Sequence, residues 1–177
     1  SPHEAPRWLC RWQVVCQDWE RRRVAHPEMR AAIARNVDTI DASTNSGGIQ
    51  VALDNENNTK VTGSSGNDTI TTGASLTTGS VNAGAGTDKL IVGTNVGHID
   101  TATEASKFTN FETLSLNGAL DVSLLSGITA IELSGAANNI SKLSAPQAGS
   151  VTATADIGAT TIALANSSGT SDALTLI

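Results

Sequence analysis

Residues 61–93 read VTGSSGNDTITTGASLTTGSVNAGAGTDKLIVG and contain one nine-residue pattern twice. The first copy runs from Gly63 to Thr71 as GSSGNDTIT, and the second runs from Ala83 to Ile91 as AGAGTDKLI. Each copy has two small residues, a glycine in fourth place, an aspartate in sixth place and an aliphatic residue in eighth place. A motif of this length that recurs along a chain predicts stacked units of structure.

The residue types of the motif suit the binding of Ca²⁺. Glycine permits backbone angles that turn carbonyl oxygens inward, and the carboxylates of Asp68 and Asp88 are hard anionic ligands. Because Ca²⁺ takes about six to eight oxygens, one such loop supplies only part of the shell, and a second loop must stack on it. The alternative is a pair of ordinary Gly/Asn/Asp turns between strands, with no metal.

The spacing of the two aspartates constrains how the loops can stack. Asp68 and Asp88 lie 20 residues apart, whereas two nine-residue units would separate them by 18. If the loops stack, two extra residues must bulge out, and we expect the bulge in residues 74–80.

Short aliphatic segments recur from residue 36 onward, with Gly, Asn, Asp and Ser between them. Val122, Ile131 and Ile140, for example, follow one another at intervals of nine residues. Strands at such intervals fit a β-sandwich, a barrel or a solenoid. The regular interval and the near absence of aromatic residues favour an all-β solenoid, with Phe108 and Phe111 as core anchors where the coil changes shape.

Residues 1–35 differ from the rest in composition. They hold all three Trp, both Cys and seven of the eleven basic residues, so we place a domain boundary between residues 35 and 36. Trp8, Trp12, Cys16 and Trp19 form one apolar stripe at helical spacing, which predicts a helix over 7–34 with a break at Pro27. Three roles stay open for it: a solenoid cap, a helix on an anionic membrane surface, or a segment unrelated to the body.

Charge and the remaining titratable residues limit the partners of the body, residues 36–177. Its four Lys stand against thirteen Asp and Glu, which argues against nucleic acid and favours divalent cations. Without cysteine, the body must be stabilised by stacking or by metal, as in extracellular bacterial proteins. No apolar run reaches the length of a transmembrane helix and no signal peptide is visible. We expect His3, His26 and His98 to be surface residues.

GSSGNDTITTG and AGAGTDKLIVG resemble the repeats-in-toxin, or hemolysin-type, calcium-binding family. The segments FTNFETLSL, LLSGITAIELSG and GTSDALTLI resemble the calcium-dependent surface-layer (S-layer) proteins of Gram-negative bacteria. The resemblance covers residues 36–177. It implies a right-handed parallel β-helix or β-roll, Ca²⁺ between successive turns, and type I secretion to the cell surface. By motif position, the metal site would include Asp68 and Asp88, with the loop positions Gly63, Ser65, Gly66, Asn67, Gly84, Ala85, Gly86 and Thr87.

Two functions follow as expectations. The first is a structural, calcium-stabilised segment of a secreted surface-layer or adhesin-like protein, with possible self-association into a surface lattice. The second is a calcium-binding accessory domain of a type I-secreted enzyme such as a protease or lipase. We expect no enzymatic activity in this chain, because it has neither an H-E-x-x-H nor a G-x-S-x-G motif. The sequence stops inside an apolar strand pattern, so we also expect it to be a piece of a longer protein.

Overall fold

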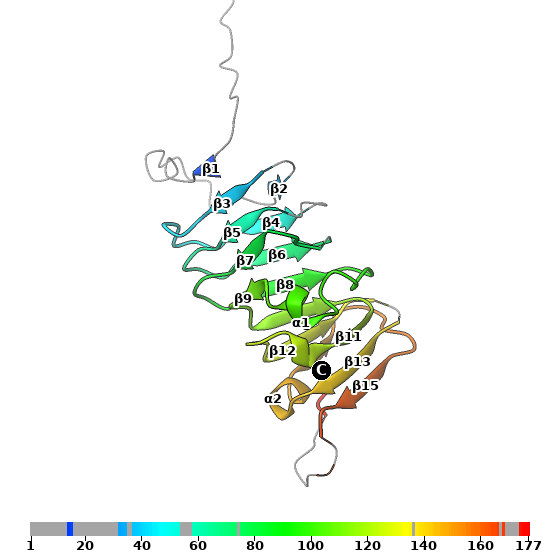
Figure 1. The fold of residues 1–177 in the computed structure, drawn as a ribbon. Helices are drawn as coiled ribbons and strands as arrows, with labels where there is room; N and C mark the ends of the chain where they lie inside the picture. Colours follow the sequence, from blue (N-terminus) through cyan, green and yellow to red (C-terminus); the bar gives the residue numbers. More distant parts are fainter. Residues whose placement is uncertain are drawn as a thin grey trace, which may run out of the picture.

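The computed structural model describes residues 14–15, 32–34, 37–53, 58–73, 75–135, 137–166, 168 and 174–177. Over this part of the chain the strands follow six successive coils of a β-solenoid (Figure 1). Neighbouring coils are joined by parallel pairing throughout the three sheets. The predicted all-β, parallel solenoid is therefore confirmed.

Each coil contributes strands to two sides of the solenoid. The first sheet contains β1 (Val14–Val15), β3 (Thr39–Asp41), β5 (Lys60–Thr62), β7 (Ser80–Asn82) and β9 (Phe108–Thr109). The second contains β2 (Ala32–Ala34), β4 (Gln50–Leu53), β6 (Thr69–Thr72), β8 (Lys89–Val92), β10 (Thr113–Leu116), β12 (Ala130–Leu133) and β14 (Val151–Ala153). The third contains β11 (Ala119–Asp121), β13 (Asn139–Leu143) and β15 (Thr161–Leu164).

The core is built from rows of aliphatic side chains that repeat from coil to coil. The central row of the second sheet, in which no side chain is more than 1% exposed, consists of Val51, Ile70, Leu90, Leu114, Ile131 and Val151. Burying each such side chain stabilises the fold by roughly 1.5–3 kcal/mol. The alternation of inward and outward residues along each strand sets the register of this row.

The solenoid changes shape at the coil formed by β9, β10 and β11. The first sheet ends at β9 and the third sheet begins at β11, while the second sheet continues through β10. Phe108 and Phe111, each 2% exposed, lie at this transition, which confirms them as core anchors. The short 3₁₀ helix η2 (Val122–Leu124) follows β11 directly.

An insertion, residues 93–107, separates β8 from β9 and carries helix α1 (Ala102–Ala105). The side chain of Thr101 caps this helix by accepting a hydrogen bond from the Glu104 backbone N–H. Within the insertion, His98 is only 2% exposed, so the prediction that it is a surface residue is wrong. His3 and His26 lie outside the described residues.

Helix α2 (Ala145–Ala148) connects β13 to β14. Gln147, which is 5% exposed, accepts a hydrogen bond from the Ser144 backbone N–H and donates one to the Ile128 carbonyl oxygen. This buried amide therefore ties α2 to the neighbouring coil.

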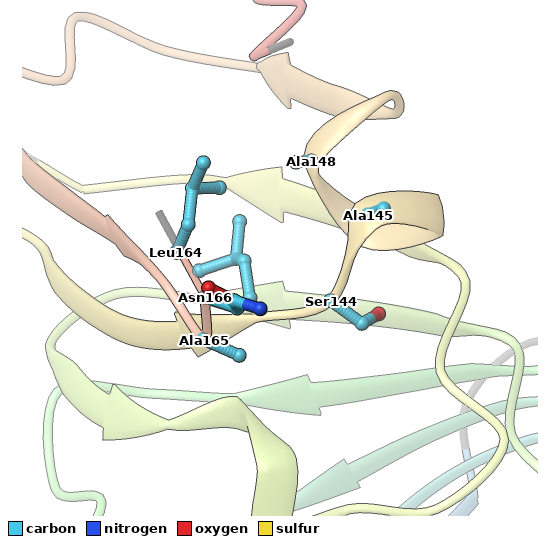
Figure 2. Close-up of a pocket in the computed structure, with 7 residues that line it drawn as sticks. Ser144, Ala145, Ala148, Leu164, Ala165 and Asn166 are labelled. Atoms are coloured by element: carbon cyan, nitrogen blue, oxygen red, sulfur yellow. The ribbon is translucent and has the colours of Figure 1, made fainter. Parts of the chain in front are cut away.

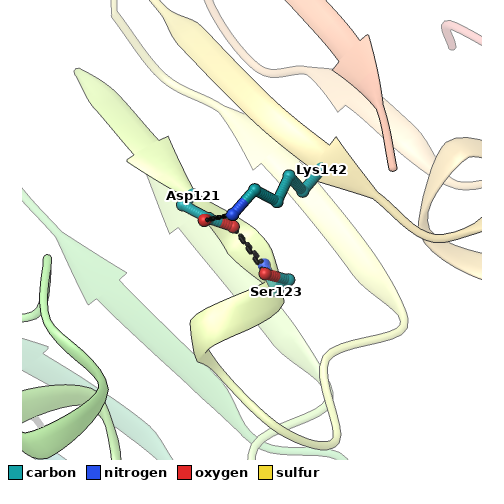
Figure 3. A network of polar contacts seen from close by, with 3 residues as sticks. All are labelled: Asp121, Ser123 and Lys142. Carbon is teal, nitrogen blue, oxygen red and sulfur yellow. Dashed lines mark hydrogen bonds and ion pairs between the residues drawn. The ribbon is translucent and has the colours of Figure 1, made fainter. Parts of the chain in front are cut away.

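One polar network links β11 to β13 in the third sheet. Lys142 Nζ lies 2.6 Å from Asp121 Oδ2, and the Ser123 backbone N–H and hydroxyl donate to Asp121 Oδ1 (Figure 3). The hydrogen bonds from Lys142 and Ser123 lower the pKa of Asp121 below its usual value. Lys142 is largely exposed, so we expect this ion pair to add little stability.

The described residues of the N-terminal segment are strands, which corrects the predicted helix at those positions. Val14 and Val15 pair with Ile40 and Asp41, and Ala32–Ala34 pair with Val51–Leu53. The open edges of the two sheets offer backbone hydrogen bonds that outweigh local helical preference. The rest of the predicted helix over 7–34 lies outside the described residues, and the boundary at 35/36 stays a prediction. None of the helices in the described residues is long and apolar enough to span a membrane.

Candidate metal site in the stacked loops

The two motif loops lie directly above one another at one corner of the solenoid. Thr62 pairs with Asn82 before the loops, and Thr69 pairs with Lys89 after them. The predicted stacking is therefore confirmed. Both registers are offset by 20 residues, so the two loops stack with 20 residues per coil; the bulge expected in residues 74–80 stays a prediction.

The glycines of the motif are required by close backbone contact between the stacked loops. A Cβ at Gly63 would lie 1.9 Å from the Ala83 carbonyl oxygen, and one at Gly84 would lie 2.3 Å from that of Ser64. Gly86, at φ +144°, faces the Gly66 carbonyl oxygen in the same way. No side chain fits at these positions, so the packing alone explains the glycines, whether or not a metal binds.

The carboxylate of Asp68 is buried, and both of its oxygens accept hydrogen bonds. Its Oδ1 accepts from the Ile49 backbone N–H at 2.7 Å and from the Ser64 hydroxyl at 2.6 Å. Its Oδ2 accepts from the Ser64 backbone N–H at 2.7 Å. Three donors already point at this carboxylate, so in this geometry Asp68 is a poor metal ligand and a strong organiser of the loop.

The carboxylate of Asp88 has the same place in its coil but fewer partners. Its Oδ1 accepts from the Asp68 backbone N–H at 2.7 Å, while its Oδ2 is buried without a hydrogen-bond partner. The difference arises because Gly84 stands where Ser64 stands in the first loop, which removes the hydroxyl donor. The Gly84 backbone N–H donates to Asn82 Oδ1 instead.

Glu112 extends the series by one more coil, although the sequence motif did not identify it. Its Oε2 accepts from the Asp88 backbone N–H at 2.8 Å. We call Asp68, Asp88 and Glu112 the acidic column. Each of these carboxylates accepts a hydrogen bond from the previous coil, from the backbone N–H of the residue just before its strand in the second sheet. The signal in the sequence is the acid two residues before a buried aliphatic residue, as in Glu112-Thr113-Leu114.

The electrostatic environment of Asp88 disfavours its ionised form. Burial raises the pKa of Asp88, the hydrogen bond from the Asp68 backbone lowers it, and the negative charges of Asp68 and Glu112 raise it further, with a net upward shift. Among the described residues, the ion pairs are Lys89–Glu132 and Lys142–Asp121, and neither includes Asp68 or Asp88. The charge on Asp88 therefore has no compensating cation within the described residues.

The remaining predicted loop residues take part in the stacking through backbone groups and, at Asn67, through the side chain. The Ser65 backbone N–H donates to the Asn45 carbonyl oxygen, and the Ala85 backbone N–H donates to that of Ser64. The Thr87 backbone N–H donates to Asn67 Oδ1 at 2.9 Å. Ser65, Asn67, Ala85, Gly86 and Thr87 are exposed at the corner of the solenoid.

Only part of the predicted calcium shell is therefore available. No group of three or more His, Cys, Asp or Glu side chains arranged for a metal occurs within the described residues. A cation at this corner would bind Asp88 Oδ2 and complete its shell with backbone carbonyl oxygens of the loops and water. Asp88 fits such a role, whereas Asp68 does not while it accepts its three hydrogen bonds. In the segment GTSDALTLI, residues 169–173 lie outside the described residues.

A small pocket of about 230 Å³ lies at the other end of the solenoid. It is formed between α2 and the last strands, and its lining consists of Leu143, Ser144, Ala145, Ala148, Leu164, Ala165 and Asn166 (Figure 2). The lining includes the hydroxyl of Ser144 but no acid, base or thiol that could activate it.

Comparison of the chain with models of known protein families, with curated proteins and with solved structures gave no match.

Proposed function

We propose that this chain is a structural β-solenoid whose stacked loops bind Ca²⁺, with Asp88 as the carboxylate ligand. The observation that carries the proposal is Asp88 Oδ2, which is buried, has no hydrogen-bond partner and lies close to two other carboxylates. An ionised carboxylate in such surroundings is costly, and a divalent cation removes that cost. Protonation of Asp88 is the competing explanation, and it leads to a different experimental result.

The bound ion would supply positive charge at the corner where the acidic column lies. Asp88 would hold it, and the backbone of loops 63–68 and 83–88 would orient the carbonyl oxygens around it. Because such a site exists only when the coils are stacked, binding would couple the fold of the solenoid to the calcium concentration. Calcium at extracellular concentrations would then stabilise the folded state.

Thermal unfolding with and without calcium tests the metal site. For a site with a dissociation constant of about 0.1 mM, calcium at about 10 mM stabilises by about 2.7 kcal/mol, or roughly 5–10 °C in Tm for a chain of this size. Asp88→Asn should abolish this shift. Asp121→Asn, which removes a half-buried carboxylate of the third sheet, far from the stacked loops in sequence, should retain it.

Two results would contradict the metal site. An unchanged Tm of the wild type in calcium and in chelator would exclude a stabilising ion. A calcium shift that survives in Asp88→Asn would exclude Asp88 as the ligand. If Asp88→Asn raises Tm in chelator while the wild type ignores calcium, Asp88 is protonated rather than metal-bound.

We further propose that the solenoid is part of a secreted bacterial surface-layer or adhesin-like protein. The support is the resemblance of the motif segments to the repeats-in-toxin and surface-layer families, together with the parallel solenoid that this resemblance implies. Labelling of intact cells with an antibody against residues 36–177 tests the location, and added protease should remove the signal. Retention of the signal only in lysed cells would contradict a surface location.

A further inference from the structure

His98 is the most unusual titratable residue outside the stacked loops. The residue is 2% exposed, and neither Nδ1 nor Nε2 makes a hydrogen bond of good geometry. A buried polar atom without a partner destabilises the closed form, because it has lost its hydrogen bonds to water. The cost is far greater for the charged imidazolium, so the closed insertion accepts only the neutral ring.

The insertion, residues 93–107, is attached to the neighbouring loop by few polar contacts. Lys107 Nζ donates to the Thr77 carbonyl oxygen at 2.9 Å, and the Ser75 hydroxyl donates to Glu104 Oε1 at 3.4 Å. Ile99 and Ala105 are also buried in the core, and the Lys107 carbonyl oxygen accepts a hydrogen bond from the Val81 backbone N–H, so opening must break these contacts as well. Local opening of one segment still costs less free energy than global unfolding. Opening would let water reach His98 while the three sheets remain paired.

We propose that the insertion opens at mildly acidic pH, because His98 must leave its buried position to take up a proton. Protonation then favours the open form, in which water and the nearby carboxylates of Asp100 and Glu104 surround the imidazolium. The insertion therefore acts as a pH-sensitive cover over loop 73–79.

The surroundings of His98 determine the pH range. Burial lowers the pKa of His98, while the Asn95 backbone and the charges of Glu104 and Asp100 act in the opposite direction. Hydrogen bonds, chiefly from Thr101, lower the pKa of Glu104, so Glu104 stays ionised throughout. Three neighbours of the insertion carry no ionisable side chain: loop 73–79, strand β7 and the turn at Gly118.

The sign of the effect follows from proton linkage. A histidine whose pKa is lowered in the closed form binds protons more tightly in the open form, so closure is most stable above about pH 6.5. Below that value, the population of the open form rises about tenfold per pH unit until the closed form also protonates. The increase in opening at acidic pH should be confined to residues 93–107.

Hydrogen exchange measured by mass spectrometry, corrected for the intrinsic pH dependence of exchange, tests this proposal between about pH 5 and about pH 7.5. In the wild type, protection of residues 93–107 should fall about tenfold per pH unit below about pH 6.5, while that of β10 stays constant. His98→Leu cannot titrate and should remove the pH dependence, and Glu104→Gln should retain it. Equal pH profiles in the wild type and His98→Leu would overturn the proposal.

A second measurement covers the case in which His98→Leu fails to fold. The ring resonances of His98 in the wild type should titrate below about pH 6.5, the ordinary value of an imidazole. Titration of His98 at the ordinary value of about 6.5, with no change in the exchange of residues 93–107, would also overturn the proposal.

Discussion

The same substitution at two equivalent places of the acidic column should have very different costs. In Asp68→Asn, the amide has one oxygen where the carboxylate has two, so at least one donor among Ile49 N–H, Ser64 N–H and Ser64 Oγ–H meets an NH₂ group. The variant loses a charge-assisted hydrogen bond and leaves a buried donor without a partner. Together these effects cost about 3 kcal/mol, or roughly 6–12 °C in Tm.

Asp88→Asn should cost less than about 1 kcal/mol, or even stabilise the fold. The new NH₂ group can take the place of Oδ2, which has no donor to lose, while the amide oxygen keeps the bond to the Asp68 backbone N–H. The substitution also removes a buried negative charge that lies near Asp68 and Glu112. The two variants change the same number of atoms in the same type of loop, so each serves as the control of the other.

Urea unfolding followed by circular dichroism, at neutral pH and in chelator, measures both variants without a contribution from calcium. The expected order of midpoints is Asp68→Asn far below the wild type, with Asp88→Asn equal to or above it. If Asp88→Asn is as destabilised as Asp68→Asn, Oδ2 of Asp88 has a partner and the structural argument fails. If Asp68→Asn unfolds at the same urea concentration as the wild type, the three hydrogen bonds of the Asp68 carboxylate do not hold the loops together.

Three further predictions use other features of the fold. Gly63→Ala should prevent close stacking and lower the melting temperature, because its Cβ would lie 1.9 Å from the Ala83 carbonyl oxygen. The control is Gly47→Ala, whose Cβ would meet only Asn45 Oδ1 at 3.8 Å. Equal melting temperatures of the two variants would refute the contact at Gly63. Phe111→Ala should cost about 3–5 kcal/mol in urea unfolding because the ring is buried where the sheets change, and a cost below about 1 kcal/mol would contradict that position. Burial raises the pKa of Asp88, so the folded state binds the proton of this carboxyl group more tightly than the unfolded state does. Protonation of Asp88 therefore stabilises the fold most at low pH, and this stabilisation is lost as the pH rises through the pKa of the folded state. In chelator, the wild type should therefore gain stability relative to Asp88→Asn as the pH falls from neutral towards about 4, the ordinary pKa of an aspartate, and a constant difference over that whole range would contradict a raised pKa.

Much of the architecture could be predicted because it depends on patterns that repeat along the chain. The recurring aliphatic positions, such as Val51, Ile70 and Leu90, specify strands that bury one side of each coil. The glycines of the motif, such as Gly63 and Gly84, specify loops whose backbones touch. These features are local and periodic, so reading the sequence was enough to identify a solenoid and the corner at which its loops stack.

The N-terminal segment shows where local patterns mislead. The stripe of Trp8, Trp12 and Trp19 has helical spacing, yet Val14–Val15 and Ala32–Ala34 pair with β3 and β4. Helical spacing describes only the preference of a segment in isolation. An open sheet edge supplies hydrogen bonds from residues far away in sequence, and these decide the backbone at the described positions.

Sequence alone determined the repeated positions of glycine, aspartate and aliphatic residues, and with them the stacking of coils. Tertiary structure alone decided that Asp68 is saturated with donors while Asp88 keeps a free oxygen, that Glu112 joins them, and that His98 is buried. The physical reason is that a motif specifies the residues within one coil, whereas hydrogen-bond partners and exclusion of water depend on the coils and the insertion packed against it.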